Sequence, residues 1–174
     1  MNDYIYLISS LPMLHFIGKP PSSFEKFITI CRGLIPQADL EIIQASNISG
    51  DYLQAEQKTL QAWRDFDTGL RNELVKLRAS RKHIPVASHL RQEIFLGQTI
   101  VHLALAAQKN IYPLEAEKLL DEARWNFLEE ISFGHYFDLD HLIIYAHKLL
   151  LLEKWARINT ADTQALIEGV LSIG

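Results

Sequence analysis

The residues best suited to chemistry in this sequence are an aspartate and two histidines near position 140. Asp138 and His141 are three residues apart, and His147 follows six residues later. A carboxylate and an imidazole three apart share one face of a helix, where such a pair can bind a metal ion. Dinuclear sites in helical bundles need two Glu-x-x-His pairs and two further carboxylates. Only one approximate pair is present, so we expect no metal site and interpret Asp138 as a helix cap.

The sequence carries no strong signature of nucleophilic or cofactor chemistry. Cys31 is the single cysteine, and with no histidine near it in the sequence we expect a small buried apolar group. Gly-x-Ser-x-Gly, Gly-x-Gly-x-x-Gly and phosphate-binding glycine loops are all missing. We therefore expect a protein without catalytic residues or cofactors. The enzyme alternative is a small metal-dependent hydrolase that uses Asp138, His141 and a distant carboxylate such as Glu129 or Glu130.

A second candidate site combines acidic and aromatic side chains. Residues 113–131 carry four more acidic than basic side chains, which equals the net charge of -4 of the whole chain. Trp125 lies on the shoulder of this predicted helix. One interpretation is that a second helix covers Trp125, and the other is that Trp125 anchors a basic partner within a ring of acids. The interface predicted by the second interpretation consists of Leu114, Glu117, Asp121, Glu122, Trp125, Leu128 and Trp155.

Hydrophobic periodicity and capping residues predict the helices that would position these side chains. A short helix capped by Ser22 and Glu25 begins the series, and a final helix capped by Thr160 or Asp162 ends it at Leu171. Gly97 lies within an apolar stripe, where we expect another helix to cross closely. The predicted helices span about 23–34, 38–45, 51–80, 86–109, 113–131 and 138–158, followed by the final one.

The predicted fold class is all-α, an antiparallel bundle of about five to seven helices in a single domain over residues 1–174. No convincing alternation of apolar and polar residues follows residue 20, and short connections favour antiparallel neighbours. Residues 1–20 stay ambiguous, because their composition fits either a strand or an irregular helix. An apolar content of 48% in 174 residues suffices for a continuous core.

Composition also limits the classes of partner and the cellular locations that we expect. A net charge of -4 lacks the basic excess of a nucleic-acid binder, and one cysteine allows neither a disulfide nor a zinc cluster. The N-terminus lacks the positive segment of a signal peptide, and the most apolar stretch, Leu142 to Leu152, is shorter than the roughly 20 residues of a membrane-spanning helix. We expect a soluble cytoplasmic protein.

The helix predicted at 138–158 is apolar around most of its circumference. Such a helix must be central or lie at an interface. Few other helices are available in a chain of this length to surround it, so we expect association with protein partners, with a homo-oligomer as one form.

Two stretches resemble a known family: Tyr4-Ile5-Tyr6-Leu7-Ile8-Ser9-Ser10-Leu11-Pro12 and the segment from Asp138 to Trp155. Together they resemble a bacterial family of short proteins associated with V-type ATPase operons. More distantly they resemble the helical C subunit of the V/A-type rotary ATPase, the counterpart of the eukaryotic d subunit. The resemblance implies a non-catalytic adaptor or assembly subunit that binds V-type ATPase subunits and reaches the membrane only through that complex. The alternative is a self-associating helical scaffold or regulatory domain unrelated to the ATPase.

Overall fold

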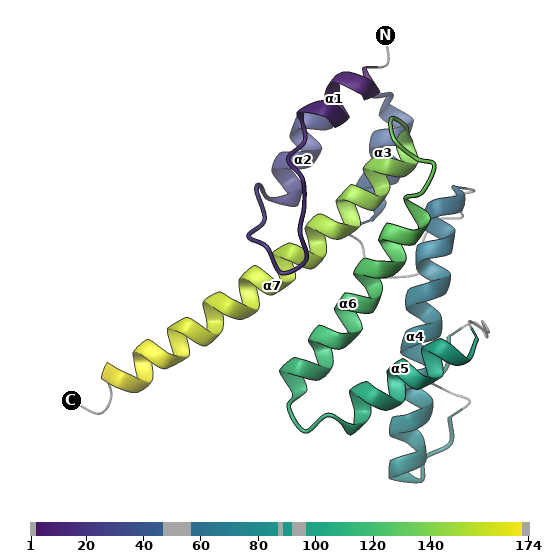
Figure 1. Cartoon of the computed structure of the whole chain (residues 1–174), viewed down its shortest axis with the longest axis vertical. Helices are drawn as coiled ribbons and strands as arrows, with labels where there is room; N and C mark the ends of the chain where they lie inside the picture. Colours follow the sequence, from purple (N-terminus) through teal and green to yellow (C-terminus); the bar gives the residue numbers. More distant parts are fainter. Residues whose placement is uncertain (1–2, 47–56, 87–88, 92–96, 172–174) are drawn as a thin grey trace. The chain divides into compact units, whose positions relative to one another are not determined.

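Within the residues that the structure describes, seven helices form the regular structure (Figure 1). The computed structural model describes residues 3–46, 57–86, 89–91 and 97–171, and it describes side chains as far as residue 161. The predicted all-α class is confirmed. In this described part, no helix combines the length and apolarity needed to cross a membrane. The helices are α1 (Tyr4–Ser10), α2 (Phe24–Cys31), α3 (Gln37–Ala45), α4 (Lys58–Lys82), α5 (Gln98–Lys109), α6 (Pro113–Ile131) and α7 (Leu139–Leu171).

The chain divides into two compact units. Unit 1 consists of residues 1–54 and 132–174, and it contains α1, α2, α3 and α7. Unit 2 consists of residues 55–131, and it contains α4, α5 and α6. The single domain predicted over residues 1–174 stays a prediction.

In unit 1, α2 and α3 pack against α7. The aromatic rings of Phe27 and Tyr145 lie 5.2 Å apart between α2 and α7. The backbone N–H of Phe24 donates to Glu153 Oε1 of α7 at 2.9 Å, which satisfies one of the free donors at the start of α2. Ser23, rather than the predicted Ser22, caps this helix, because its Oγ is the acceptor for the N–H three residues later.

The two ends of unit 1 differ from the sequence-based expectation. The ambiguous N-terminal segment contains the helix α1. At the other end, α7 continues to Leu171 without the predicted break. Thr160 does not cap a new helix, since its Oγ1 donates to the carbonyl of Ala156 one turn earlier at 2.8 Å. Asp162 also lies inside α7, so it does not begin a new helix, and its side chain is outside the described part.

In unit 2, α5 packs against both α4 and α6 around a small apolar core. Phe66 of α4 and Phe127 of α6 stack with ring centroids 4.1 Å apart. The buried amide of Asn72 accepts from the N–H of Arg91 at 3.1 Å and donates to its carbonyl at 3.4 Å. The buried core residues are Phe66, Leu70, Ile100, Ala107 and Leu120. Helix α6 has the bounds that the sequence predicted.

The starts of α4 and α5 are later than predicted. Helix α4 begins at Lys58 with Gln57 as its cap, and the predicted start and the turn expected at Asn47–Gly50 lie outside the described residues. Helix α5 begins at Gln98, so the expectation that Gly97 lies in mid-helix at a crossing is wrong. Gly97 is the residue before the helix, with a φ of 85°, and a Cβ there would meet no atom within 4 Å. The glycine is needed for its backbone conformation.

Substitution of Gly97 should therefore destabilise unit 2 through backbone strain. We expect Gly97→Ala and Gly97→Leu to lower the free energy of unfolding by similar amounts, about 1–3 kcal/mol each, because side-chain size matters little in open space. Denaturant unfolding of both variants measures this. A much larger loss for leucine than for alanine would instead indicate a crowded helix crossing.

Candidate functional site

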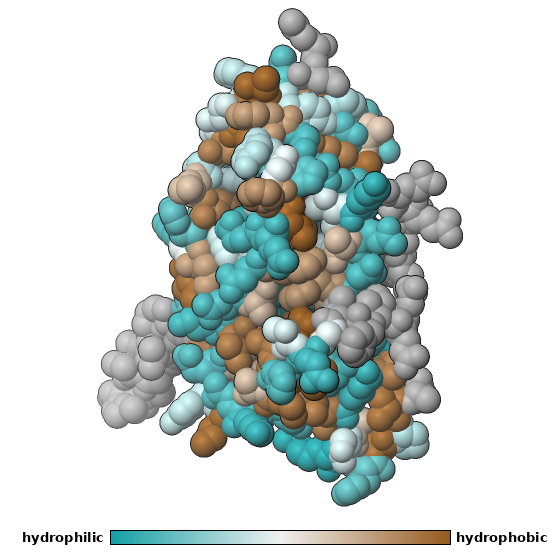
Figure 2. All heavy atoms as spheres, turned by 45° about the vertical axis from the view of Figure 1, so that its right-hand side comes forward, coloured by the Kyte–Doolittle hydropathy of each residue, from teal (hydrophilic) through white to brown (hydrophobic). Residues whose placement is uncertain are grey.

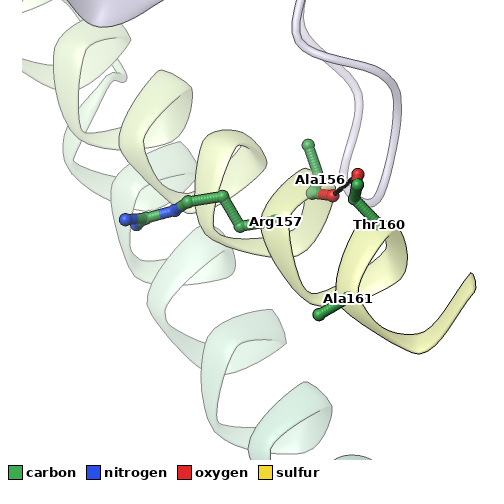
Figure 3. A pocket seen from close by; sticks show the side chains of 4 residues that line it. All are labelled: Ala156, Arg157, Thr160 and Ala161. Atoms are coloured by element: carbon green, nitrogen blue, oxygen red, sulfur yellow. Dashed lines mark hydrogen bonds between the residues drawn. The ribbon is translucent and has the colours of Figure 1, made fainter. Parts of the chain in front are cut away.

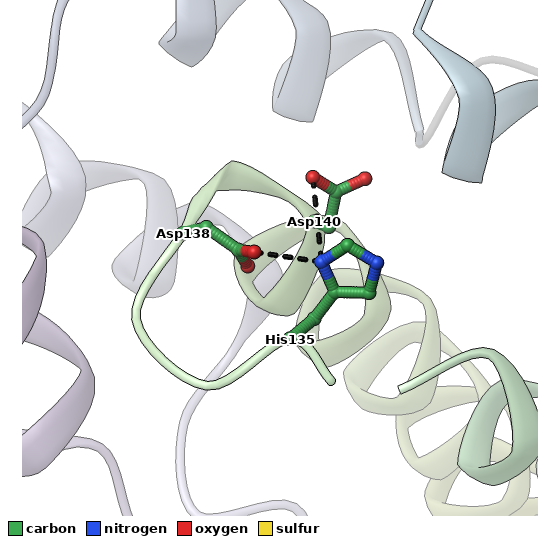
Figure 4. A group of neighbouring side chains, drawn as sticks. All are labelled: His135, Asp138 and Asp140. Carbon is green, nitrogen blue, oxygen red and sulfur yellow. Dashed lines mark hydrogen bonds and ion pairs between the residues drawn. The ribbon is translucent and has the colours of Figure 1, made fainter. Parts of the chain in front are cut away.

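A cluster of three side chains at the start of α7 is the strongest candidate for a chemical site. His135, Asp138 and Asp140 converge there, with potential ligand atoms within 4.8 Å of one another (Figure 4). His135 Nδ1 lies 2.6 Å from Asp138 Oδ2 and 3.7 Å from Asp140 Oδ2. All three side chains are partly exposed.

Local chain geometry explains why these residues meet. After α6 the chain turns at Gly134, whose φ of 90° favours glycine. Asp138 then begins α7, because its Oδ1 accepts from the N–H of His141 at 3.0 Å. The ring nitrogen Nδ1 of His141 in turn contacts the carbonyl of His135 at 3.2 Å. These contacts confirm Asp138 as the predicted cap and hold the turn before α7.

The electrostatics of the cluster favour a protonated imidazole. The hydrogen bond to Asp138 raises the pKa of His135, and the nearby charges of Asp138 and Asp140 add to this, although partial burial opposes it. A proton competes with a cation for the ring nitrogen, and the positive end of the helix dipole also disfavours a cation at this place. The cluster is therefore suited to hold a proton and brace the turn.

The predicted metal-site residues divide accordingly. Asp138 belongs to the cluster. His141 does not, because its Nδ1 contacts the backbone carbonyl of His135, and the histidine of the cluster is His135 itself. His147 is buried, and Asp140 is directed toward His135. Sequence analysis missed His135, although its position after a glycine and three residues before a capping aspartate was a usable signal.

A surface hollow on α7 offers little for catalysis (Figure 3). It is lined by Ala156, Arg157, Thr160 and Ala161, all from one helix. The hydroxyl of Thr160 is already bonded to the carbonyl of Ala156. Sixteen residues separate Asp140 from Ala156, which places the hollow about 24 Å along the helix from the cluster. The hollow and the cluster therefore do not form one site.

Cys31 is fully buried, as expected for a small apolar side chain. Burial raises the pKa of its thiol to about 12. A thiolate is therefore disfavoured at neutral pH.

The predicted partner interface contains both exposed and buried residues. Leu114 and Glu122 are exposed, whereas Glu117 is partly exposed and its Oε1 lies 3.9 Å from Arg124 Nη1. The other four, Asp121, Trp125, Leu128 and Trp155, are buried. Burial of Trp125 agrees with the alternative interpretation of a covered aromatic side chain. The chain also buries most of the apolar circumference of α7, so this helix gives no independent argument for another subunit, and self-association stays a prediction.

Asp121 was expected among the acids around Trp125, but it is fully buried in an ion network. Its Oδ1 accepts from Arg124 Nη1 at 2.7 Å, while Arg124 Nε donates to Asp67 Oδ1 of α4 at 2.9 Å. Burial lowers the pKa of Arg124, but the two carboxylates outweigh that effect and raise it overall. Arg124 therefore joins α6 to α4, and Asp121, which pairs with it inside the unit, is not available to a partner. Paired charges are the main way in which charged groups become buried.

Residues 93–170 match a family described as "Protein of unknown function (DUF2764)". The matched segment includes α5, α6 and most of α7, and hence the His135 cluster. No curated protein matches the chain, and no solved structure does. The comparisons therefore assign no activity to the cluster.

Loss of the buried ion network should destabilise unit 2 strongly. Arg124→Met removes the guanidinium that pairs with the buried carboxylate of Asp121, so we expect the free energy of unfolding to fall by about 3–5 kcal/mol. The matched control is Arg71→Met, since Arg71 also pairs with Asp67 but is half exposed. That variant should lose less than about 1 kcal/mol. Equal losses in denaturant unfolding would contradict the importance of burial.

The His135 cluster should make stability depend on pH. Because the pKa of His135 is raised in the folded protein, its contribution is complete below the ordinary value of 6.5 and is lost as pH rises through the folded pKa. The stability advantage of the wild type over His135→Gln should therefore be largest in mild acid and shrink in alkaline solution. Chemical unfolding across this range measures it.

Asp138→Asn is the matched variant for this pH series. It keeps a capping oxygen but removes the carboxylate charge, so it should flatten the pH dependence in the same way. An advantage of the wild type that grows with rising pH would contradict the assignment.

Proposed function

We propose that this chain is a non-catalytic helical adaptor or assembly subunit associated with a V-type rotary ATPase. The ATPase association rests on the resemblance of residues 4–12 and 138–155. The adaptor role is supported by an aromatic surface that precedes α7. The partly exposed His135 cluster braces this surface.

The observation that carries the proposal is the exposure of three aromatic side chains in one short turn. We call residues 133–137 the aromatic turn. Phe133, Tyr136 and Phe137 are 87%, 61% and 52% exposed. Large aromatic side chains are mostly buried in folded proteins, and those at the surface commonly serve as anchors in protein interfaces. Three in one turn fit a docking surface for another protein.

The aromatic turn is also held in shape before any partner arrives. His135, at its centre, is bonded to Asp138 through its ring and to His141 through its carbonyl. A surface that is already ordered loses less conformational entropy on binding than a mobile one. The polar cluster therefore supports the adaptor role by positioning the aromatic residues around it.

Affinity purification tests this function. The full-length tagged chain, expressed in its native source, should recover V-type ATPase subunits. The triple variant Phe133→Ser, Tyr136→Ser, Phe137→Ser should recover at least about tenfold less, because interface anchors commonly contribute 2 kcal/mol or more. Met13→Ser is the control, since Met13 is also highly exposed in unit 1 and lies outside the turn.

Other outcomes would change the assignment. Recovery of the chain alone, in a source whose ATPase is intact, would contradict the ATPase association. If the chain instead forms a dimer that the triple variant abolishes, the aromatic turn mediates self-association and the scaffold alternative holds. Equal recovery by the wild type and the triple variant would show that the turn is not the docking surface.

A further inference from the structure

Unit 2 has one end at which positive and apolar side chains are exposed together. The C-terminus of α4, the C-terminus of α5 and the connection from α5 to α6 lie at this end (Figure 1). Gln108 Nε2 donates to the carbonyl of Leu77 at 3.2 Å and so joins the last turn of α5 to the last part of α4. We call this surface the basic-apolar end, and define it by Arg81, Lys82, Ile84, Lys109, Ile111 and Tyr112.

Three cations of the basic-apolar end are exposed. Arg81 and Lys82 occupy the last turn of α4, and Lys109 is the last residue of α5. Among the described residues none of the three forms an ion pair. Glu115 is the exposed carboxylate closest along the chain to the α5–α6 connection. Its single negative charge leaves the charge of the basic-apolar end positive. This local charge contrasts with the net charge of -4 of the whole chain.

The apolar residues of the same end are unusually exposed. Ile111 is 87% exposed, Tyr112 is 69% exposed and Ile84 is 46% exposed. Figure 2 shows hydrophobic residues lying among hydrophilic ones at the lower end of the molecule. The cations at the C-terminus of α4 complement the dipole of this helix. The dipole does not explain why isoleucine and tyrosine side chains are exposed beside them.

We propose that the basic-apolar end binds directly to the surface of an anionic lipid bilayer. Lysine and arginine attract anionic headgroups, and aliphatic and aromatic side chains enter the boundary between headgroups and acyl chains. A nucleic acid would use the cations but not the exposed Ile111, and the acidic balance of the chain disfavours it. This contact needs no other protein, so it is separate from the ATPase association proposed above.

Vesicle sedimentation with the purified full-length chain tests the proposal. The chain should sediment with vesicles of phosphatidylcholine and phosphatidylserine, and much less with phosphatidylcholine alone. Raising the salt concentration from about 0.1 M to about 0.5 M should weaken binding, because it shortens the range of the electrostatic attraction.

Two double variants separate the contributions of charge and apolar contact. Arg81→Ser with Lys82→Ser should weaken binding to the anionic vesicles by about tenfold or more, since each cation near such a surface contributes about fivefold. Ile111→Ser with Tyr112→Ser should weaken it by a similar factor. The matched controls are Lys26→Ser and Phe133→Ser, an exposed cation and an exposed aromatic residue of unit 1, and both should bind as the wild type does.

Three results would overturn the proposal. The first is equal sedimentation with anionic and neutral vesicles. The second is equal loss of binding in the controls and the two double variants. The third is dependence on the cations but not on Ile111 and Tyr112, together with competition by double-stranded RNA, which would identify a nucleic acid as the ligand. Circular dichroism of each variant shows whether the helices are intact.

Discussion

The apolar circumference of α7 is the constraint on which unit 1 depends. Residues 142–147 are six consecutive buried positions, more than one full helical turn, so this part of the helix is covered on all sides. Helices α2 and α3 supply part of that cover, and Tyr145 Oη donates to the carbonyl of Pro12 in the segment after α1. Burial of one late helix therefore brings together the two ends of the sequence. Its capped start also fixes where the aromatic turn and the His135 cluster lie.

Unit 2 depends on a different interaction, the buried pairing of Arg124 with Asp67 and Asp121. A buried guanidinium needs both carboxylates, because an unpaired charge inside a protein costs several kcal/mol. The acids of α6 are consequently of two kinds. Asp121 is buried, while Glu122 is exposed to solvent. The acidic composition of α6 is thus only partly a property of its surface.

The exposed surfaces of the two units have different chemistry. Unit 1 exposes the aromatic turn, which His135 and Asp138 brace. Unit 2 exposes the basic-apolar end, where cations lie beside isoleucine and tyrosine. An adaptor needs surfaces that distinguish one partner from another. An aromatic surface and a cationic surface bind different classes of partner. The proposed ATPase association and the proposed bilayer contact would each use one of them.

The sequence by itself determined the all-α class, the bounds of α6 and the capping role of Asp138. These follow from short-range physics, since periodicity and capping involve residues three or four apart. Tertiary structure decided that Asp121 is buried, that Gly97 precedes α5 instead of lying inside it, and that α7 continues past Thr160. It also brought Lys109, at the end of α5, to the end of α4 that carries Arg81 and Lys82. Burial and ion pairing across helices depend on which distant segments pack together, and the local pattern of a single sequence does not contain that information.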